Sequence, residues 1–141
     1  MIKKNIFLNN NENIFINEKY EKKQFITQYE KYFYNVINNL NDKYIIIPQV
    51  NLATIINKKN KVYCNELFRN IDFAIFDKKF NIKLLIEIND KSHLKSKRIK
   101  RDINVKKICK DANIPIIFFY SKYKNNPKYI INRILNKIEK D

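Results

Sequence analysis

Residues 71–89 read IDFAIFDKKFNIKLLIEIN. Two runs rich in β-branched and aromatic residues are separated here by a short polar segment, residues 78–81. Two strand-like runs joined by a short turn predict a β-hairpin. Each run also carries one acid among apolar neighbours, Asp72 in the first and Glu87 in the second. The stretch therefore predicts a central β-hairpin that carries two candidate functional carboxyl groups.

The segments before the hairpin predict a helix and a third strand. Apolar residues recur at helical spacing from residue 25 to residue 40. Thr27 followed by Glu30 is a capping-box pattern, so the helix is predicted to begin directly after Thr27. Residues 44–50 form an extended run that contains Pro48. Because proline cannot donate to a sheet ladder, this strand is predicted at an edge or at a strand end.

The segments after the hairpin predict a helix, a strand and a final helix. The basic stretch 91–110 has a helix-like second half, with Ile99 and Ile103 in a narrow apolar stripe. Residues 114–120 form a fully apolar strand, and Pro127 is placed to open the last helix. The order helix, strand, strand, strand, helix, strand, helix predicts an α/β fold with a mixed sheet flanked by helices. Residues 1–20 are read as an irregular leader and 21–141 as one domain.

The charge of the chain favours a polyanionic partner. Lys and Arg number 29 against 14 Asp and Glu, which gives a formal net charge of +15. Residues 91–110 hold nine Lys or Arg and a single acid. A field of this sign attracts nucleic acid, and a block of one sign suggests phosphate contacts. The alternative is that an AT-rich genome raises the lysine content without any such partner.

Several classes of protein are excluded. Glycine is absent, so neither a P-loop nor a dinucleotide-binding fingerprint is present. Cys64 and Cys109 form no CxxC pair, and with a single histidine they make no recognisable zinc site. The longest apolar run, residues 114–120, is far too short to span a bilayer. We therefore expect a cytoplasmic protein without a membrane partner.

The two acids of the hairpin suggest a metal site. If the two strands pair through the turn, alternation of side chains lets Asp72 and Glu87 point to the same face. An unpaired carboxylate in a buried strand costs several kcal/mol, so a compensating group is needed. Two converging carboxylates suit Mg²⁺, which prefers oxygen ligands. The alternative is that each acid faces solvent or pairs with a lysine.

The chain also resembles a known superfamily. The resemblance is carried by the Ile71-Asp72-Phe73 strand and by Ile86-Glu87-Ile88-Asn89-Asp90-Lys91-Ser92-His93, with Glu30 before them and Arg101-Asp102 and Lys106 after them. This succession, within about residues 25 to 120, is similar to a branch of the PD-(D/E)XK nucleases known mainly as a domain of unknown function. That branch is related in pattern to small restriction-like and very-short-patch-repair endonucleases. The resemblance implies a restriction-endonuclease-like core.

The resemblance also implies roles for the acids. Asp72 and Glu87 would bind Mg²⁺, or Mn²⁺ in its place, with help from the carbonyl of Ile88. Glu30 would reach the same site through water, and its other reading is the second half of the capping box. Asn89 stands where the superfamily has lysine and this branch tends to have aspartate, so it departs from the pattern. An amide lacks the charge of either residue but can still orient the attacking water.

The basic residues complete the expected site. Lys91 or Lys106 would stabilise charge on the phosphate, and His93 would act as a phosphate donor or general acid. His93 is otherwise a loop residue. Asp102 and Lys106 share a helix face, either lining the substrate groove or forming a surface ion pair. The residues expected to hold nucleic acid are Lys95, Lys97, Arg98, Lys100, Arg101 and Gln49.

Metal-dependent hydrolysis of phosphodiester bonds, in DNA rather than RNA, is the function that the sequence favours. A metal at the acids would activate a water to attack the phosphorus in line. Two alternatives stay open, a non-catalytic nucleic-acid-binding module on the same fold and a structural domain whose charge reflects genome composition. Strandedness, sequence preference and oligomeric state, including a homodimer, stay open as well.

Overall fold

The computed structural model describes residues 19–60, 65–89, 96–121 and 124–140. Three helices and four strands lie within these ranges. In chain order they are α1 (Gln28–Ile37), β1 (Tyr44–Asn51), β2 (Asn70–Asp77), β3 (Ile82–Asn89), α2 (Ser96–Asp111), β4 (Ile116–Tyr120) and α3 (Pro127–Ile138). Short 3-10 helices occupy Asn38–Leu40, Leu52–Thr54 and Asn65–Leu67.

The strands form one mixed sheet in the order β1-β2-β3-β4. β2 pairs antiparallel with both β1 and β3, while β3 and β4 run parallel. Strands that run parallel need a long connection, and α2 lies within the one between β3 and β4. The predicted α/β fold with a mixed sheet is confirmed. β1, which contains Pro48, is an edge strand, as the proline indicated.

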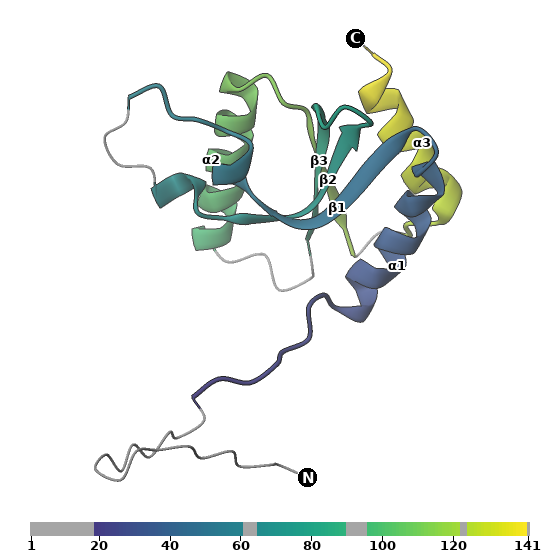
Figure 1. The fold of residues 1–141 in the computed structure, drawn as a ribbon, viewed down its shortest axis with the longest axis horizontal. Coiled ribbons are helices and arrows are strands. Elements are labelled where there is room, and N and C mark those ends of the chain that lie inside the picture. Colours follow the sequence, from purple (N-terminus) through teal and green to yellow (C-terminus); the bar gives the residue numbers. More distant parts are fainter. Residues whose placement is uncertain (1–18, 61–64, 90–95, 122–123, 141) are drawn as a thin grey trace, which may run out of the picture.

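Helices cover both faces of this sheet (Figure 1). On one face α1 and α3 enclose a core that includes Phe33, Phe119 and Ile134, all fully buried. On the other face α2 packs through Val105 and Cys109. Burying a large apolar side chain contributes about 1.5–3 kcal/mol, so the two cores together fix the helices on the sheet. The sheet is therefore the middle layer, and its strand ends are the places where polar groups can gather.

The buried stripe of α2 differs from the predicted one. Ile99 and Ile103 are 49% and 45% exposed, so the prediction that they form the apolar stripe is wrong. The residues of α2 that pack against the sheet are instead Val105, Cys109 and, in part, Ile108. The C-terminal half of α2 lies over the core, whereas its N-terminal half borders an open cleft. That half consequently has no apolar layer to pack against.

Turns are made without glycine. Within the described residues, Gln49, Phe80 and Asn113 adopt positive φ angles. In the hairpin turn the side chain of Asp77 accepts the backbone N–H groups of Lys79 and Asn81, both at 2.9 Å. Asn113 follows α2, and the next N–H returns to the carbonyl of Cys109 at 2.8 Å, which closes the helix end as a glycine usually does. Asp77 thus supports the hairpin turn, in which Phe80 adopts the left-handed conformation, and Asn113 adopts it at the end of α2.

Most predicted elements agree with the structure. The capping box at the start of α1 is confirmed, since Thr27 and Glu30 each bond the other's backbone. Pro127 is the first residue of α3. Of the predicted leader, residues 1–18 lie outside the described residues. No helix in the described ranges has both the length and the apolar character needed to cross a bilayer.

Candidate active site

A cleft of about 590 Å³ opens at one end of the sheet. Its lining comes from α1, β2, β3 and α2, so it lies where the two helical layers meet the strand ends. The acids Glu30, Asp72 and Glu87 contribute to the lining, together with the arginines Arg69, Arg98 and Arg101. Both acids of the predicted hairpin site therefore face the same space.

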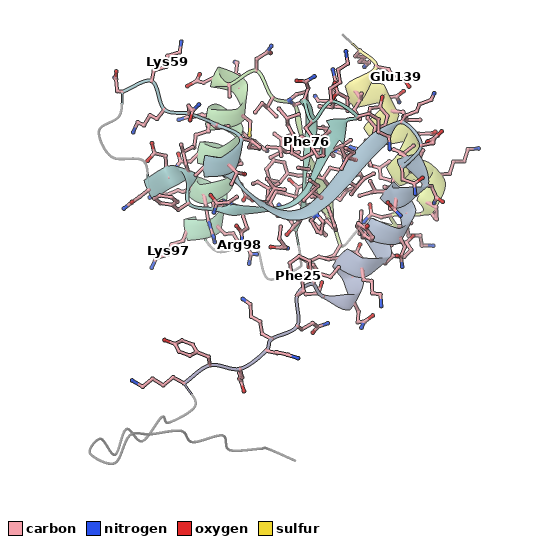
Figure 2. All side chains as sticks on the ribbon, viewed as in Figure 1. Phe25, Lys59, Phe76, Lys97, Arg98 and Glu139 are labelled. Carbon is pink, nitrogen blue, oxygen red and sulfur yellow. The ribbon has the colours of Figure 1, made fainter. Side chains whose placement is uncertain are left out.

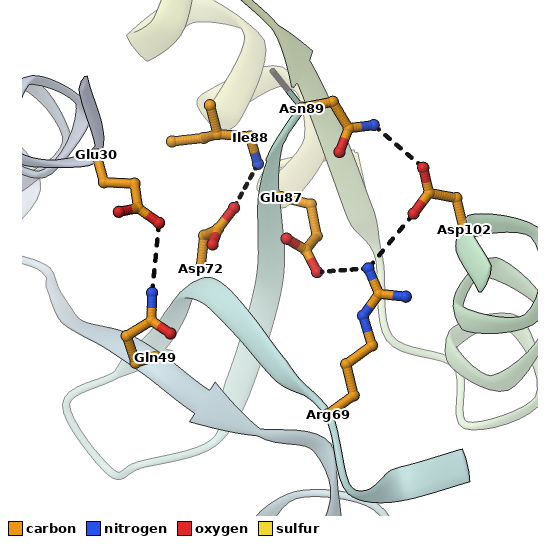
Figure 3. A network of polar contacts seen from close by, with 8 residues as sticks. All are labelled: Glu30, Gln49, Arg69, Asp72, Glu87, Ile88, Asn89 and Asp102. Atoms are coloured by element: carbon orange, nitrogen blue, oxygen red, sulfur yellow. Dashed lines mark hydrogen bonds and ion pairs between the residues drawn. The ribbon is translucent and has the colours of Figure 1, made fainter. Parts of the chain in front are cut away.

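Asp72 is fixed by a contact that continues the sheet. The regular pairing of β2 with β3 extends as far as Phe73 and Ile86. Beyond that pair, Oδ2 of Asp72 accepts the backbone N–H of Ile88 at 2.7 Å. The carboxylate thus takes the place of a backbone acceptor, and its side chain is held against β3 (Figure 3).

Gln49 lies across from Asp72 on the edge strand. Its neighbours in β1 pair regularly with β2, Pro48 with Phe73 and Val50 with Ile71, but Gln49 has a φ of 56°. Such a conformation in a residue other than glycine costs about 1–3 kcal/mol and tends to persist at functional sites. The Gln49 side chain donates a long hydrogen bond of 3.5 Å to Glu30. The strained position therefore connects the sheet edge to the acid of α1.

Glu87 is 6% exposed and lies beside Asp72. Burial, and then the negative charge and hydrogen bond of Asp72, raise the pKa of Glu87 to about 9. Burial also raises the pKa of Asp72, while hydrogen bonds with Glu87 and the Ile88 N–H oppose that rise. Two neighbouring acids, one buried and one half-buried, cannot both ionise without a large cost in free energy. In the metal-free protein the pair therefore holds a proton, carried by Glu87, at neutral pH.

Arg69 links this pair to α2. It lies directly before β2, and its Nη2 donates to Glu87 Oε1 at 3.3 Å and to Asp102 Oδ1 at 3.4 Å. The other oxygen of Asp102 accepts the Asn89 amide at 3.2 Å. Figure 3 shows the resulting chain from Glu87 through Arg69 to Asp102 and Asn89. Asp102 thus bonds to Arg69 and Asn89, whereas one of the two sequence alternatives had it in a surface ion pair with Lys106.

Glu30 takes part in two arrangements. Its carboxylate accepts the backbone N–H of Thr27 in the capping box. It also lines the cleft, and its negative charge contributes to raising the pKa of Asp72. The two readings of Glu30 are therefore compatible in geometry.

The predicted basic residues fall into two groups. Arg98 and Arg101 line the cleft, whereas Lys97 and Lys100 are exposed on the same part of α2. Figure 2 shows Lys97 and Arg98 at the N-terminal end of that helix, on the side where Phe25 leads into α1. Lys106 lies 4.7 Å over the ring of Phe118 and is not part of the cleft lining. The predicted roles of Lys91, His93 and Lys95 concern positions outside the described residues.

Sequence reasoning missed Arg69, and with it the link to α2. Its partners are 18 and 33 residues away, so no local pattern marks them. The available signal was the Glu87 carboxyl group within a buried strand, because a buried polar group needs a polar or charged partner. Tyr29 and Asn70, which also line the cleft, were missed as well.

The residues fit a hard divalent cation in part. Among the described residues, no group of three or more His, Cys, Asp or Glu is arranged to hold a metal. Mg²⁺, however, usually takes only one or two carboxylates and keeps water or substrate phosphate for its other positions. Asp72 and Glu87 each have one oxygen bonded elsewhere, to the Ile88 N–H and to Arg69. The remaining carboxylate oxygens of Asp72 and Glu87 are of the type that Mg²⁺ binds.

Fold and site together define an α/β protein with an acidic and arginine-lined cleft at the end of its sheet. The family DUF2726, described as a protein of unknown function, matches residues 22–138, and the chain belongs to this family. No curated protein and no solved structure matches the chain significantly.

Proposed function

We propose that this protein is a Mg²⁺-dependent nuclease of the PD-(D/E)XK type that hydrolyses phosphodiester bonds, in DNA rather than RNA. The observation that carries the proposal is that Asp72 and Glu87 lie side by side in the lining of an open cleft (Figure 3). Two neighbouring carboxylates away from bulk water repel each other, and a cation between them offsets that repulsion. The resemblance in sequence adds the reaction type.

The chain's own residues have distinct tasks in this proposal. Asp72 and Glu87 would hold the metal, assisted by the carbonyl of Ile88. Bound there, Mg²⁺ lowers the pKa of a water and offsets charge on the phosphate. The Ile88 N–H keeps the Asp72 carboxylate in one orientation at 2.7 Å. Such fixed orientation matters because catalytic groups must be held close to their productive geometry.

In this proposal Asn89 and Glu30 act on the reacting water. Asn89 is 6% exposed, lies on the cleft and is oriented by its bond to Asp102. Glu30 approaches from the opposite side and is oriented by Thr27 and Gln49. Arg98, Arg101, Lys97 and Lys100 hold the nucleic-acid backbone through phosphate contacts.

The test is nicking of supercoiled plasmid with and without Mg²⁺, for the wild type and for Glu87→Gln. Glutamine keeps the size of the side chain and removes the ionisable group. Glu139→Gln, an exposed position that Figure 2 shows far from Arg98, is the matched control. We expect metal-dependent nicking by the wild type and the control, and none by Glu87→Gln. Equal nicking by all three proteins would overturn the assignment of the site.

A second candidate is a nucleic-acid-binding module without catalysis. Asn89 favours it, because its amide is bonded to Asp102 and supplies no positive charge at this position. In that case DNA binding needs no metal and is unaffected by Asp72→Ala. Salt-sensitive binding that persists in both proteins, with no nicking in Mg²⁺ or Mn²⁺, would favour this candidate.

A further inference from the structure

The guanidinium of Arg69 has unused binding capacity. A single nitrogen, Nη2, makes both of its carboxylate contacts, at 3.3 and 3.4 Å. Hydrogen bonds between charged partners are usually about 2.7–2.9 Å long, so both contacts are loose. The second nitrogen, Nη1, is buried and has no hydrogen-bond partner among the described residues. Leaving a buried charged donor unpaired is costly, which indicates that a further acceptor belongs here.

Other cations converge on the same cleft. Arg98 and Arg101 line it from the first two turns of α2. The first turn of this helix contains no acid, although a helix N-terminus is partly positive and favours negative charge. Cations at this position are unfavourable in the free protein. They become favourable when an anion lies between them and the helix end.

The acid contacts of this group are few. Among the described residues, the ion pairs of these three arginines with carboxylates all belong to Arg69, with Glu87 and Asp102. Asp102 is shared between Arg69 and Asn89. Arg69 therefore makes its carboxylate contacts through one of its nitrogens, and Arg98 and Arg101 are exposed where they line the cleft.

We propose that Arg69, Arg98 and Arg101 form a binding site for a phosphate group of the nucleic-acid backbone, directly beside the Asp72–Glu87 pair. This inference rests on the proposed function and names the group that recognises its substrate. Arg69 turns about its loose contacts, so that its guanidinium donates to the phosphate while Asp102 retains it. Arginine suits this task because its planar fork donates two parallel hydrogen bonds to a phosphate. No covalent step is involved.

The test follows the arginine Nε–Hε resonances in a nitrogen–proton correlation spectrum of the metal-free full chain. Inorganic phosphate is the first probe, and a short DNA duplex without terminal phosphates is the second. We expect both probes to shift the resonances of Arg69, Arg98 and Arg101 saturably. Arg133 donates to the carbonyl of Phe118 and lies over the ring of Phe119, so its resonance is the internal control and stays fixed.

Two outcomes of this titration contradict the proposal. If neither probe moves the Arg69 resonance, Arg69 does not bind phosphate. If inorganic phosphate moves it and the duplex does not, the site takes a free phosphate and not the nucleic-acid backbone. Both readings come from the wild-type protein, so they do not depend on the folding of a variant.

Variants then separate a built site from general attraction by charge. Arg98→Gln and Arg69→Lys are each expected to weaken phosphate binding by about tenfold, within the range for loss of one charge-assisted contact. Lys59→Gln removes one positive charge, as Arg98→Gln does, at a position that Figure 2 shows well away from Arg98. We expect Lys59→Gln to leave phosphate affinity unchanged. Equal weakening by Lys59→Gln would show that only the net charge matters.

The same experiments distinguish this inference from the proposed function. Shifts of the three arginines in a protein that cleaves no nucleic acid would leave the phosphate site standing and remove the hydrolysis. Metal-dependent cleavage with an unmoved Arg69 resonance would support the hydrolysis and contradict the phosphate site. Glu87→Gln is expected to lose cleavage and to keep the phosphate shifts.

Discussion

The carboxylate of Asp72 accepts the backbone N–H of Ile88 at 2.7 Å and so continues, with a side chain, the pairing of β2 with β3. Asp72 is therefore both a structural acceptor and a member of the acid pair. These two tasks make different demands on the residue. The structural task needs only an oxygen, whereas the pairing with Glu87 depends on charge.

Two substitutions at Asp72 separate these tasks. Asp72→Ala leaves the half-buried Ile88 N–H without its partner and is expected to lower the free energy of unfolding by about 1–3 kcal/mol. Asp72→Asn retains an acceptor oxygen and is expected to be clearly more stable than Asp72→Ala. Both should abolish metal-dependent nicking. Urea unfolding of the three proteins checks the order, and equal stability of the two variants would show that the Ile88 contact contributes little.

The pKa of Glu87 predicts that the metal-free protein loses stability as pH rises. The folded state keeps a proton to about pH 9, whereas an unfolded glutamate releases it near its ordinary pKa of 4.5. The folded state thus binds more protons between these values, and the free energy of unfolding falls there by on the order of 1 kcal/mol per pH unit. Urea unfolding of Glu87→Gln, which cannot titrate, should show a flatter profile. Parallel profiles would mean that Glu87 is ionised in the folded protein.

Mg²⁺ should stabilise the protein increasingly as pH rises. The cation must displace the shared proton, so its apparent affinity grows as proton concentration falls. Ligand binding to the folded state alone raises the unfolding temperature by mass action. Thermal unfolding with and without Mg²⁺, repeated after removal of the metal by a chelator, measures this effect. A shift that is independent of pH, or that persists in Asp72→Asn, would place the metal elsewhere.

Thr27 and Glu30 allow the two readings of Glu30 to be tested separately. Thr27→Ala removes half of the capping box and is expected to cost about 1 kcal/mol. It leaves the Glu30 carboxylate in place, so nicking should persist. Glu30→Gln retains an amide oxygen for the cap and removes the charge from the cleft. If Glu30 acts on the reaction, Glu30→Gln loses more nicking activity than Thr27→Ala, and the reverse order would leave Glu30 with the capping role alone.

Phe33 couples the core to the cleft. It is fully buried, packs against Phe119 and Tyr29, and lies one helical turn after Glu30. Phe33→Ala is expected to cost about 3–5 kcal/mol, and Phe33→Leu substantially less. Because the cavity loosens α1 on the sheet, nicking should decline in the folded fraction of Phe33→Leu. Circular dichroism melting and plasmid nicking on the same samples would reveal whether packing and activity are independent.

Much of the fold was predictable because its signals are local. The hairpin of β2 and β3, the proline of the edge strand, the capping box and the proline at the start of α3 each occupy a few adjacent residues. The N-terminal half of α2 could not be read in this way. Its apolar residues Ile99 and Ile103 have the spacing of a buried stripe but are exposed, because burial depends on which part of α2 packs on the sheet.

The candidate site was predictable for its acids and not for their partners. Asp72 and Glu87 stand out because charged residues interrupt apolar strands. The bonds of Arg69 to Glu87 and of Asn89 to Asp102 join separate elements, so they depend on how α2 docks on the sheet. The positive φ of Gln49 leaves no trace in a sequence that contains no glycine. Long-range geometry, and not residue type, decides these features.

Because the chain has no glycine, other residues adopt its left-handed conformations, and two of these positions lie outside the cleft lining. Phe80 and Asn113 sit in left-handed backbone at a hairpin turn and at a helix end, away from the cleft lining. Phe80→Gly would relieve the left-handed strain and raise the thermal stability of the protein without changing the acids of the cleft. Glycine at Gln49 would relieve a similar conformation but would remove the side chain that reaches Glu30. Thermal stability and the chemistry of the cleft can therefore be changed at separate positions of this chain.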